Sequence, residues 1–160
     1  MLDVPVFPLG SDEYWMQQAL LLADKAASLG EVPVAALVVQ NGQLIGQGWN
    51  QPISSCDPTA HAEIVALRDA ATNIGNYRLV DATLYVTLEP CSMCAGAITH
   101  ARIQRVVYAT NEPKAGVVVS QAQFFQQAYL NHRPDVLGGV LATQSQEKLQ
   151  QFFRRRRGKC

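Results

Sequence analysis

The chain has 160 residues, 48% of them hydrophobic and 16% charged, which is typical of one globular domain with a buried core. No apolar run reaches the roughly 18–20 residues that a membrane span needs, and the start lacks the pattern of a secretory signal. Thirteen basic residues balance 13 acidic ones, but five of the basic residues lie within 152–160. The rest of the chain is therefore acidic, with eight bases against 13 acids, and we expect a basic tail.

The first half of the chain predicts a helix followed by a β-hairpin. Apolar residues recur at three- to four-residue spacing over 12–29, which favours an amphipathic helix. The β-rich runs 32–40 and 43–49 flank the dipeptide Asn41-Gly42, a strong signal for a two-residue hairpin turn. We therefore expect an antiparallel hairpin at the N-terminal end of a sheet.

Helices and strands alternate through the rest of the chain. A helix is expected over 58–74, with Asp57 as its cap and Pro58 at its first helical position. The remaining strands are expected at 82–88, 105–110 and 136–141, and the remaining helices at 91–101, 121–128 and 143–155. In the last of these, Thr143 and Gln146 form a capping-box pattern.

This order of elements predicts an α/β fold in a single domain, residues 1–160, whose basic C-terminal helix and tail cover about 143–160. Strands that alternate with helices after an initial antiparallel hairpin imply a mixed sheet, here of five strands, with helices on both faces.

Two short stretches carry metal-binding residues. "CDPTAHAEI" (56–64) places His61 at the start of one predicted helix, and "PCSMC" (90–94) places Cys91 and Cys94 at the start of another. Cysteines at i and i+3 share one helix face, so both thiolates can reach one ion, and the imidazole would be a third ligand. Zinc with three protein ligands keeps a fourth position for water, which is typical of catalytic sites. With no export signal expected, metal or thiol chemistry is favoured over disulfides.

Glu63 is the candidate acid–base residue of this site. It follows His61 by two residues, about 200° around a helix, so it is better placed beside a bound water than as a fourth ligand. A carboxylate there can take a proton from the water and return it to a leaving group. Two helix N-termini directed at the ion would also stabilise thiolates.

The spacing alone leaves two other interpretations open. Cys91 and Cys94 after a strand could form a thioredoxin-like dithiol. Cys56 could also join His61 and the two cysteines in a closed structural zinc site, although spacing favours the catalytic arrangement. The conjunction of H-x-E with a later P-C-x-x-C is the signature of zinc-dependent nucleobase deaminases.

A longer resemblance follows the same residues. The chain resembles the bacterial tRNA-specific adenosine deaminases of the cytidine-deaminase-like superfamily from about Glu13 to Arg156, with the motifs in the same order. The stretches that carry it are "GWNQPISSCDPTAHAEIVALRDAA", "NYRLVDATLYVTLEPCSMCAGAI", "ARIQRVVYAT", "LNHR" and "FFRRRR". The last of these favours the branch that acts on tRNA over deaminases of free bases.

The resemblance implies a three-layer α/β/α, cytidine-deaminase-like fold, one Zn²⁺ per subunit and a homodimer. Since no export signal is expected, the cytoplasm is the expected location. It implies hydrolytic deamination of adenosine to inosine at the wobble position of a tRNA anticodon stem-loop. The site residues that it implies are His61, Cys91 and Cys94 as zinc ligands, Glu63 as proton shuttle, and Asn50 and Ala62 as substrate-binding residues.

The expected RNA contacts lie in the later part of the chain. An aromatic pair before four arginines combines stacking surface with phosphate-binding charge, although the same residues could simply anchor and solvate a last helix. The candidates are Glu112, Lys114, Asn131, Phe152, Phe153, Arg154 and Arg156. The sequence departs from the resemblance at Glu112, where the family usually has Asp, and in the bulkier run "GVVVS".

Two alternative functions are kept at this point. A deaminase of free guanine, cytosine or a nucleoside would share the zinc motifs but would not need the basic tail. An RNA-binding module with a structural zinc would need Cys56 in the metal site. His100 and His132 are expected to be structural, at a helix end and in a turn.

Overall fold

A computed structural model describes residues 5–158, so the last two residues of the predicted basic tail lie outside the described part. Its elements in chain order are α1 (Asp12–Ser28), β1 (Ala35–Gln40), β2 (Gln43–Trp49), α2 (Ala62–Ile74), β3 (Ala82–Leu88), α3 (Ser92–His100), β4 (Arg105–Thr110), the 3₁₀ helix η1 (Phe124–Gln126), β5 (Asp135–Leu137) and α4 (Ala142–Arg157). No helix in this part of the chain is both long and apolar enough to cross a membrane.

The five strands form one mixed sheet, as predicted, and their order in it is β2-β1-β3-β4-β5. β1 pairs antiparallel with both β2 and β3, whereas β4 lies parallel to β3 and to β5. The hairpin is thus at one edge of the sheet, and the parallel strands β3 and β4 lead into the later site segments. Because β3 and β4 are parallel, their carboxyl ends lie side by side at the same end of the sheet.

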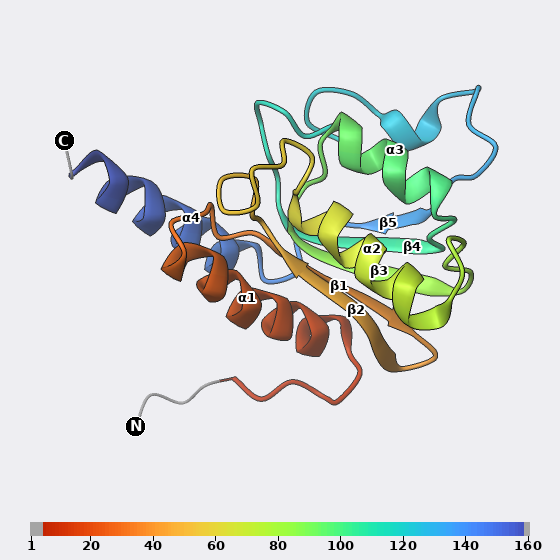
Figure 1. Ribbon diagram of the computed structural model, residues 1–160, viewed down its shortest axis with the longest axis horizontal. Helices are drawn as coiled ribbons and strands as arrows, with labels where there is room; N and C mark the ends of the chain where they lie inside the picture. The colour runs from red at the N-terminus through yellow and green to blue at the C-terminus, as the bar shows by residue number, and fades with distance from the viewer. Residues whose placement is uncertain (1–4, 159–160) are drawn as a thin grey trace.

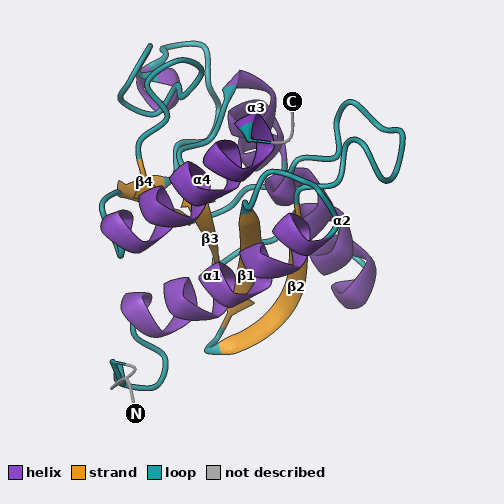
Figure 2. Cartoon of the chain, turned by 90° about the vertical axis from the view of Figure 1, so that its left-hand side faces the viewer, coloured by secondary structure: helices purple, strands orange, loops and turns teal. Residues whose placement is uncertain are grey.

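Helices cover both faces of the sheet and complete the predicted three layers (Figure 1). α2 and α3 pack on one face, where their alanine, leucine and isoleucine side chains join the larger hydrophobic core. α1 packs on the other face through Met16, Ala19 and Leu20, and α4 lies beside it (Figure 2). The two cysteines and the histidine of the candidate metal site therefore start helices on the same face.

Two glycines of β2 allow α2 to lie directly on the sheet. A Cβ atom at Gly46 would come within 2.5 Å of the backbone nitrogen of Ala70, and one at Gly48 within 2.6 Å of that of Ala66. Both distances are far inside van der Waals contact, so only glycine permits this approach. The hairpin therefore sets the distance between α2 and the sheet, and with it the position of His61 before α2.

The predicted start of α2 was wrong by four residues. Instead of starting a helix, Asp57 closes a tight turn, because its carboxylate accepts hydrogen bonds of 2.8 Å from both the backbone nitrogen and the hydroxyl of Thr59. The helix begins at Ala62, with His61 as the extended residue before it. The Asp57 carboxylate forms this Asx turn, so it cannot also cap the start of a helix.

The C-terminal predictions were also partly wrong. The helix expected at 121–128 is the short η1, and the strand expected at 136–141 is the three-residue β5. The capping box does not form, because Leu141 precedes α4 in a left-handed conformation (φ 54°). Ser145 instead donates its hydroxyl to the carbonyl of Thr87 at 2.5 Å and ties α4 to β3.

Candidate active site

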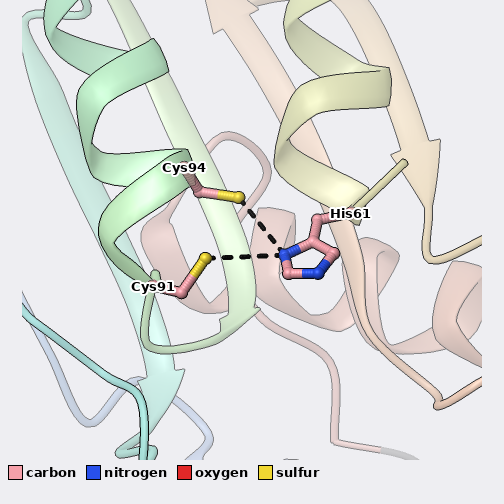
Figure 3. A group of neighbouring side chains, drawn as sticks. All are labelled: His61, Cys91 and Cys94. Atoms are coloured by element: carbon pink, nitrogen blue, oxygen red, sulfur yellow. Dashed lines mark hydrogen bonds between the residues drawn. The ribbon is translucent and has the colours of Figure 1, made fainter. Parts of the chain in front are cut away.

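His61, Cys91 and Cys94 converge on one point between α2 and α3 (Figure 3). The Nδ1 atom of His61 lies 3.5 Å from Sγ of Cys91 and 3.6 Å from Sγ of Cys94. All three ligand atoms lie within 4.8 Å of one another. His61 and Cys91 are the residues just before their helices, so both helix N-termini are directed at the group. The structure brings together the three residues that the two motifs predicted.

The local fields favour thiolate at one of the two cysteines. A hydrogen bond from Cys94, with further help from His61, lowers the pKa of Cys91 to about 4. The same Cys91 contact, together with burial, raises the pKa of Cys94. The hydrogen bond with Cys91 raises the pKa of His61. The Cys91 thiolate therefore lies at the positive N-terminal ends of two helices, which stabilise its charge.

The donor set fits a zinc ion. With zinc–sulfur bonds of about 2.3 Å and zinc–nitrogen bonds of about 2.05 Å, tetrahedral ligands lie about 3.5–3.6 Å apart. The observed sulfur-to-nitrogen distances of 3.5 and 3.6 Å match that spacing. One nitrogen and two sulfur donors leave a fourth position for water, as in catalytic zinc sites.

Cys56 is not part of the group. Its side chain is exposed, and its thiol lies 3.8 Å from the carbonyl oxygen of Ile53. Among the described residues, the cluster of ligand atoms within 4.8 Å contains His61, Cys91 and Cys94 and excludes Cys56. This geometry removes the closed four-ligand site that the sequence had left open.

Glu63 lies in the first turn of α2, next to this group, and is 4% exposed. Burial raises the pKa of its carboxyl, and a hydrogen bond with Cys94 partly offsets that effect. A carboxyl whose pKa is raised toward neutrality can both accept and release a proton. Its position fits the predicted acid–base role, and it is outside the ligand cluster.

The two predicted substrate-binding residues lie at the end of β2 and at the start of α2. Asn50 directly follows β2, where its backbone nitrogen donates to the carbonyl of Val34 at 2.9 Å and its side chain is half-buried. Ala62 is the first residue of α2, and its side chain is fully buried. The rigid hairpin thus holds Asn50, and α2 holds Ala62.

Comparison with known proteins agrees with this geometry. Residues 9–110 match the model of the cytidine and deoxycytidylate deaminase zinc-binding region. A tRNA-specific adenosine deaminase of Haemophilus influenzae is 54% identical over 147 residues, 91% of this chain and 85% of the relative. The chain belongs to the tRNA-specific adenosine deaminases.

Two solved structures resemble this chain to different extents. A structure from a study of A-to-I editing by tRNA:A34 deaminases at the wobble position of transfer RNA is 44% identical. It has a TM-score of 0.83 and the match covers 85% of this chain and 99% of that one. A guanine deaminase from Bacillus subtilis is 41% identical, but the match covers only 63% and 65% of the two chains, with a TM-score of 0.61. The match to the wobble-deaminase structure thus covers more of this chain than the match to this guanine deaminase.

The loop after β4, residues 111–120, carries two of the predicted RNA contacts in this deaminase. The carboxylate of Glu112 accepts a hydrogen bond of 2.9 Å from the backbone nitrogen of Lys114. Glu112, the departure from the family's usual Asp, therefore shapes the turn that presents Lys114. The longer side chain still reaches the backbone group two residues on.

Lys114 faces the C-terminal helix across a groove of about 580 Å³, which is lined by Lys114, Gln150, Phe153, Arg156 and Arg157. Phe153 is 42% exposed, whereas Phe152 is half-buried and stacks on Arg156 with the guanidinium 5.6 Å from the ring centroid. Arg154 and Asn131 are exposed but do not line this groove. Sequence reasoning missed Gln150 and Arg157, although the four-residue arginine run was a signal for the latter.

Sequence reasoning also missed two buried acids beside the site, Glu31 and Glu89, which are 1% and 3% exposed. Glu31 accepts hydrogen bonds from the backbone nitrogens of Ile53 and Ser54, at 3.3 and 2.8 Å, and so holds the loop before His61. A lone acid within an apolar run, as in "GEVPV" and "TLEPC", was the signal that could have found them.

His132 is structural, as expected, because its Nε2 lies 2.6 Å from the carbonyl oxygen of Ile103 and ties the loop before β5 to the segment before β4. His100 is the exposed last residue of α3, also as expected.

Proposed function

We propose that this protein hydrolyses the 6-amino group of adenosine to give inosine at the wobble position of a tRNA anticodon. The convergence of His61, Cys91 and Cys94 beside the buried Glu63 carries the proposal. The identities of 54% to a tRNA-specific adenosine deaminase and of 44% to the wobble-deaminase structure support tRNA as the substrate over a free base.

The chain's own residues supply binding and proton transfer. His61, Cys91 and Cys94 would hold a zinc ion, which when bound would act as a Lewis acid and lower the pKa of a water molecule. Glu63 takes the proton from the attacking water and delivers it to the leaving ammonia, because it is a buried carboxyl with a raised pKa. The side-chain amide of Asn50 hydrogen-bonds the base. Ala62, the first residue of α2, contacts the base beside the metal site.

RNA binding is proposed for the groove between Lys114 and α4. Its lysine and arginine side chains supply charge for phosphates, and the exposed ring of Phe153 supplies a stacking surface. Since the body of the chain is acidic, binding concentrates at this basic rim. An unpaired loop base is also cheaper to extrude into a pocket than a base in a duplex.

The test is incubation of the purified protein with bulk tRNA, followed by measurement of inosine and of zinc in the same sample. We expect about one zinc per chain and inosine in the anticodon loop of tRNA, with free adenosine and cytosine poorly converted. Equal or better conversion of a free nucleoside or base would reject the tRNA assignment and favour the free-base branch.

We also propose a homodimer in the cytoplasm, where tRNA is available. A shallow apolar hollow of about 380 Å³ lies across α2 and α3 on the side that faces away from the sheet, and Tyr77 at its rim is 68% exposed. Exposed aromatic and aliphatic surface of this kind is typical of a subunit contact. Tyr77→Glu should shift the protein from dimer to monomer in sedimentation velocity; an unchanged mass would place the contact elsewhere.

A further inference from the structure

Glu89 organises the loop that carries Lys114. Its carboxylate accepts hydrogen bonds from four backbone nitrogens of the loop and from one hydroxyl. One oxygen accepts from the nitrogen of Glu112 at 3.0 Å and from the hydroxyl of Ser120. The other accepts from the nitrogens of Val118, Val119 and Ser120, each at 3.0 Å. A single side chain thus joins the two ends of the loop.

The loop backbone is packed against this carboxylate. A Cβ atom at Gly116 would lie 2.4 Å from Cδ of Glu89 and 2.6 Å from the carbonyl oxygen of Glu112. Gly116 is therefore required by the close approach, and the loop is wrapped around Glu89 with no room between them. Val117 adds a backbone hydrogen bond of 3.0 Å to the carbonyl of Pro90.

The position of Glu89 links this loop to the metal site. Glu89 lies just after β3 and two residues before Cys91, and its backbone nitrogen donates to the carbonyl of Thr110 at 2.9 Å. Its main chain therefore holds the end of β4 while its side chain holds the loop that follows. The short turn between β3 and α3 therefore precedes the two cysteines and also holds the loop that places Lys114 opposite α4.

We propose that Glu89 is a positioning residue for the nucleic-acid substrate, which acts by holding loop 111–120 in the conformation that presents Lys114 to the groove. It does not touch the substrate itself, because it is buried. Zinc binding does not depend on it, because its hydrogen bonds go to the loop. This inference rests on the proposed tRNA substrate for its effect on activity, but not for its effect on the loop.

The first experiment compares wild type with Glu89→Gln. The amide keeps the size but turns an NH₂ group toward backbone donors, so at least one of the four backbone hydrogen bonds is lost. We expect hydrogen exchange at the amides of 112 and 118–120 to rise by tenfold or more, while the amides of α2 and α3 are unchanged. KM for tRNA should rise about tenfold, with zinc content unchanged and kcat reduced much less.

Two further variants separate positioning from general stability. Ser120→Ala removes one hydrogen bond and no charge, so it should move KM and loop exchange in the same direction by about two- to threefold. It also keeps the test available if Glu89→Gln does not fold. Asp12→Asn, which breaks the ion pair between the start of α1 and Arg105 and touches neither the loop nor the groove, should lower stability without changing either loop exchange or KM.

The outcomes are distinguishable. Unchanged loop exchange in both variants, or faster loop exchange with intact zinc and an unchanged KM, would overturn the role of Glu89. If wild type makes no inosine in tRNA, the proposed substrate fails, but the exchange experiment still decides whether Glu89 holds the loop. Faster loop exchange with a raised KM and intact zinc supports the proposal.

Discussion

α2 and α4 lie on opposite faces of the sheet and are held in very different ways. α2 buries six of its residues, including Glu63, and rests on two glycines of β2. Of the sixteen residues of α4, all within the described part of the chain, Ser145 is the one that is buried, and the last turn is a run of four arginines. The helix that carries the proposed proton shuttle is closely packed, whereas the helix that faces the proposed RNA is mostly solvated.

This contrast follows from what each region has to do. The three proposed ligands and the proposed proton carrier would have to hold their places to within a fraction of an ångström, and close packing provides that precision. A polyanionic substrate is attracted over about 10 Å by exposed charge, which needs no such precision and would be costly to bury. Substitutions in α2 should therefore act on turnover and folding, and those in α4 on binding.

The largest expected effect is on turnover, from Glu63→Gln. The amide cannot carry the proton, so kcat on tRNA should fall by about 10²–10⁴-fold while zinc content stays the same. The matched control is Glu147→Gln, the same chemical change at an exposed position of α4, which should leave kcat unchanged. Inosine formation under single-turnover conditions and zinc analysis measure both. Activity close to wild type would remove Glu63 from the mechanism.

The next effect is on folding, from Gly48→Ala. The new methyl group would lie 2.6 Å from the nitrogen of Ala66 and 2.7 Å from the carbonyl oxygen of Ala62, so α2 must move away from β2 at the turn that carries Glu63. We expect a loss of about 2–3 kcal/mol in the free energy of unfolding and weaker zinc retention. Gly158→Ala, at the end of α4, meets its nearest atom at an ordinary 3.6 Å and should change stability by less than about 0.5 kcal/mol. Equal effects in denaturant titrations would contradict the packing contrast.

The α2 region was also the more predictable of the two. The H-x-E and P-C-x-x-C motifs identified the three ligand positions, because each motif fixes side chains within one turn of a helix. Strand alternation and the Asn41-Gly42 turn predicted the five-stranded mixed sheet for the same reason. Local patterns predict local geometry, and here both ligand-bearing segments are local.

What the sequence could not predict depends on contacts distant along the chain. Nothing near Glu89 shows that a loop more than 20 residues later will wrap around it. Ser145 lies where a capping box was expected, but it bonds to Thr87, 58 residues away, and α4 starts differently as a result. The rejection of Cys56 as a ligand likewise required the folded turn at Asp57.

The contrast extends to the two helices of the other face, α1 and α4. Asp12 at the start of α1 accepts two hydrogen bonds from Arg105, at 2.8 and 2.6 Å, and these lower its pKa below the usual 3.8. α4 is tied to α1 by the more exposed pair Lys148–Asp24. Asp12→Asn should lower the free energy of unfolding by about 2 kcal/mol at neutral pH, against less than about 1 kcal/mol for Asp24→Asn.

The pH dependence of this difference has a definite sign. Because the pKa of Asp12 is lower in the folded chain, its contribution is fully present above its ordinary pKa and is lost as the pH falls through the folded value. The stability gap between wild type and Asp12→Asn should therefore be constant above about pH 5 and close toward pH 2–3. A gap that is independent of pH in urea titrations would mean that the carboxylate charge is not what holds α1.

The smallest expected effect comes from a substitution in α4 and changes only the affinity for tRNA. Arg157 is exposed and lines the groove opposite Lys114, so its removal costs the fold almost nothing but deletes one phosphate contact. For Arg157→Ala we expect Kd for tRNA to rise several-fold at low salt and the slope of log K against log salt to fall by about 1. Arg78→Ala, an exposed arginine that does not line this groove, should change neither the slope nor kcat. Counterion release comes only from groups that contact phosphate. An equal change of slope in both variants would therefore show that tRNA binding depends only on net charge. The anticodon stem-loop would then not lie in the groove beside α4.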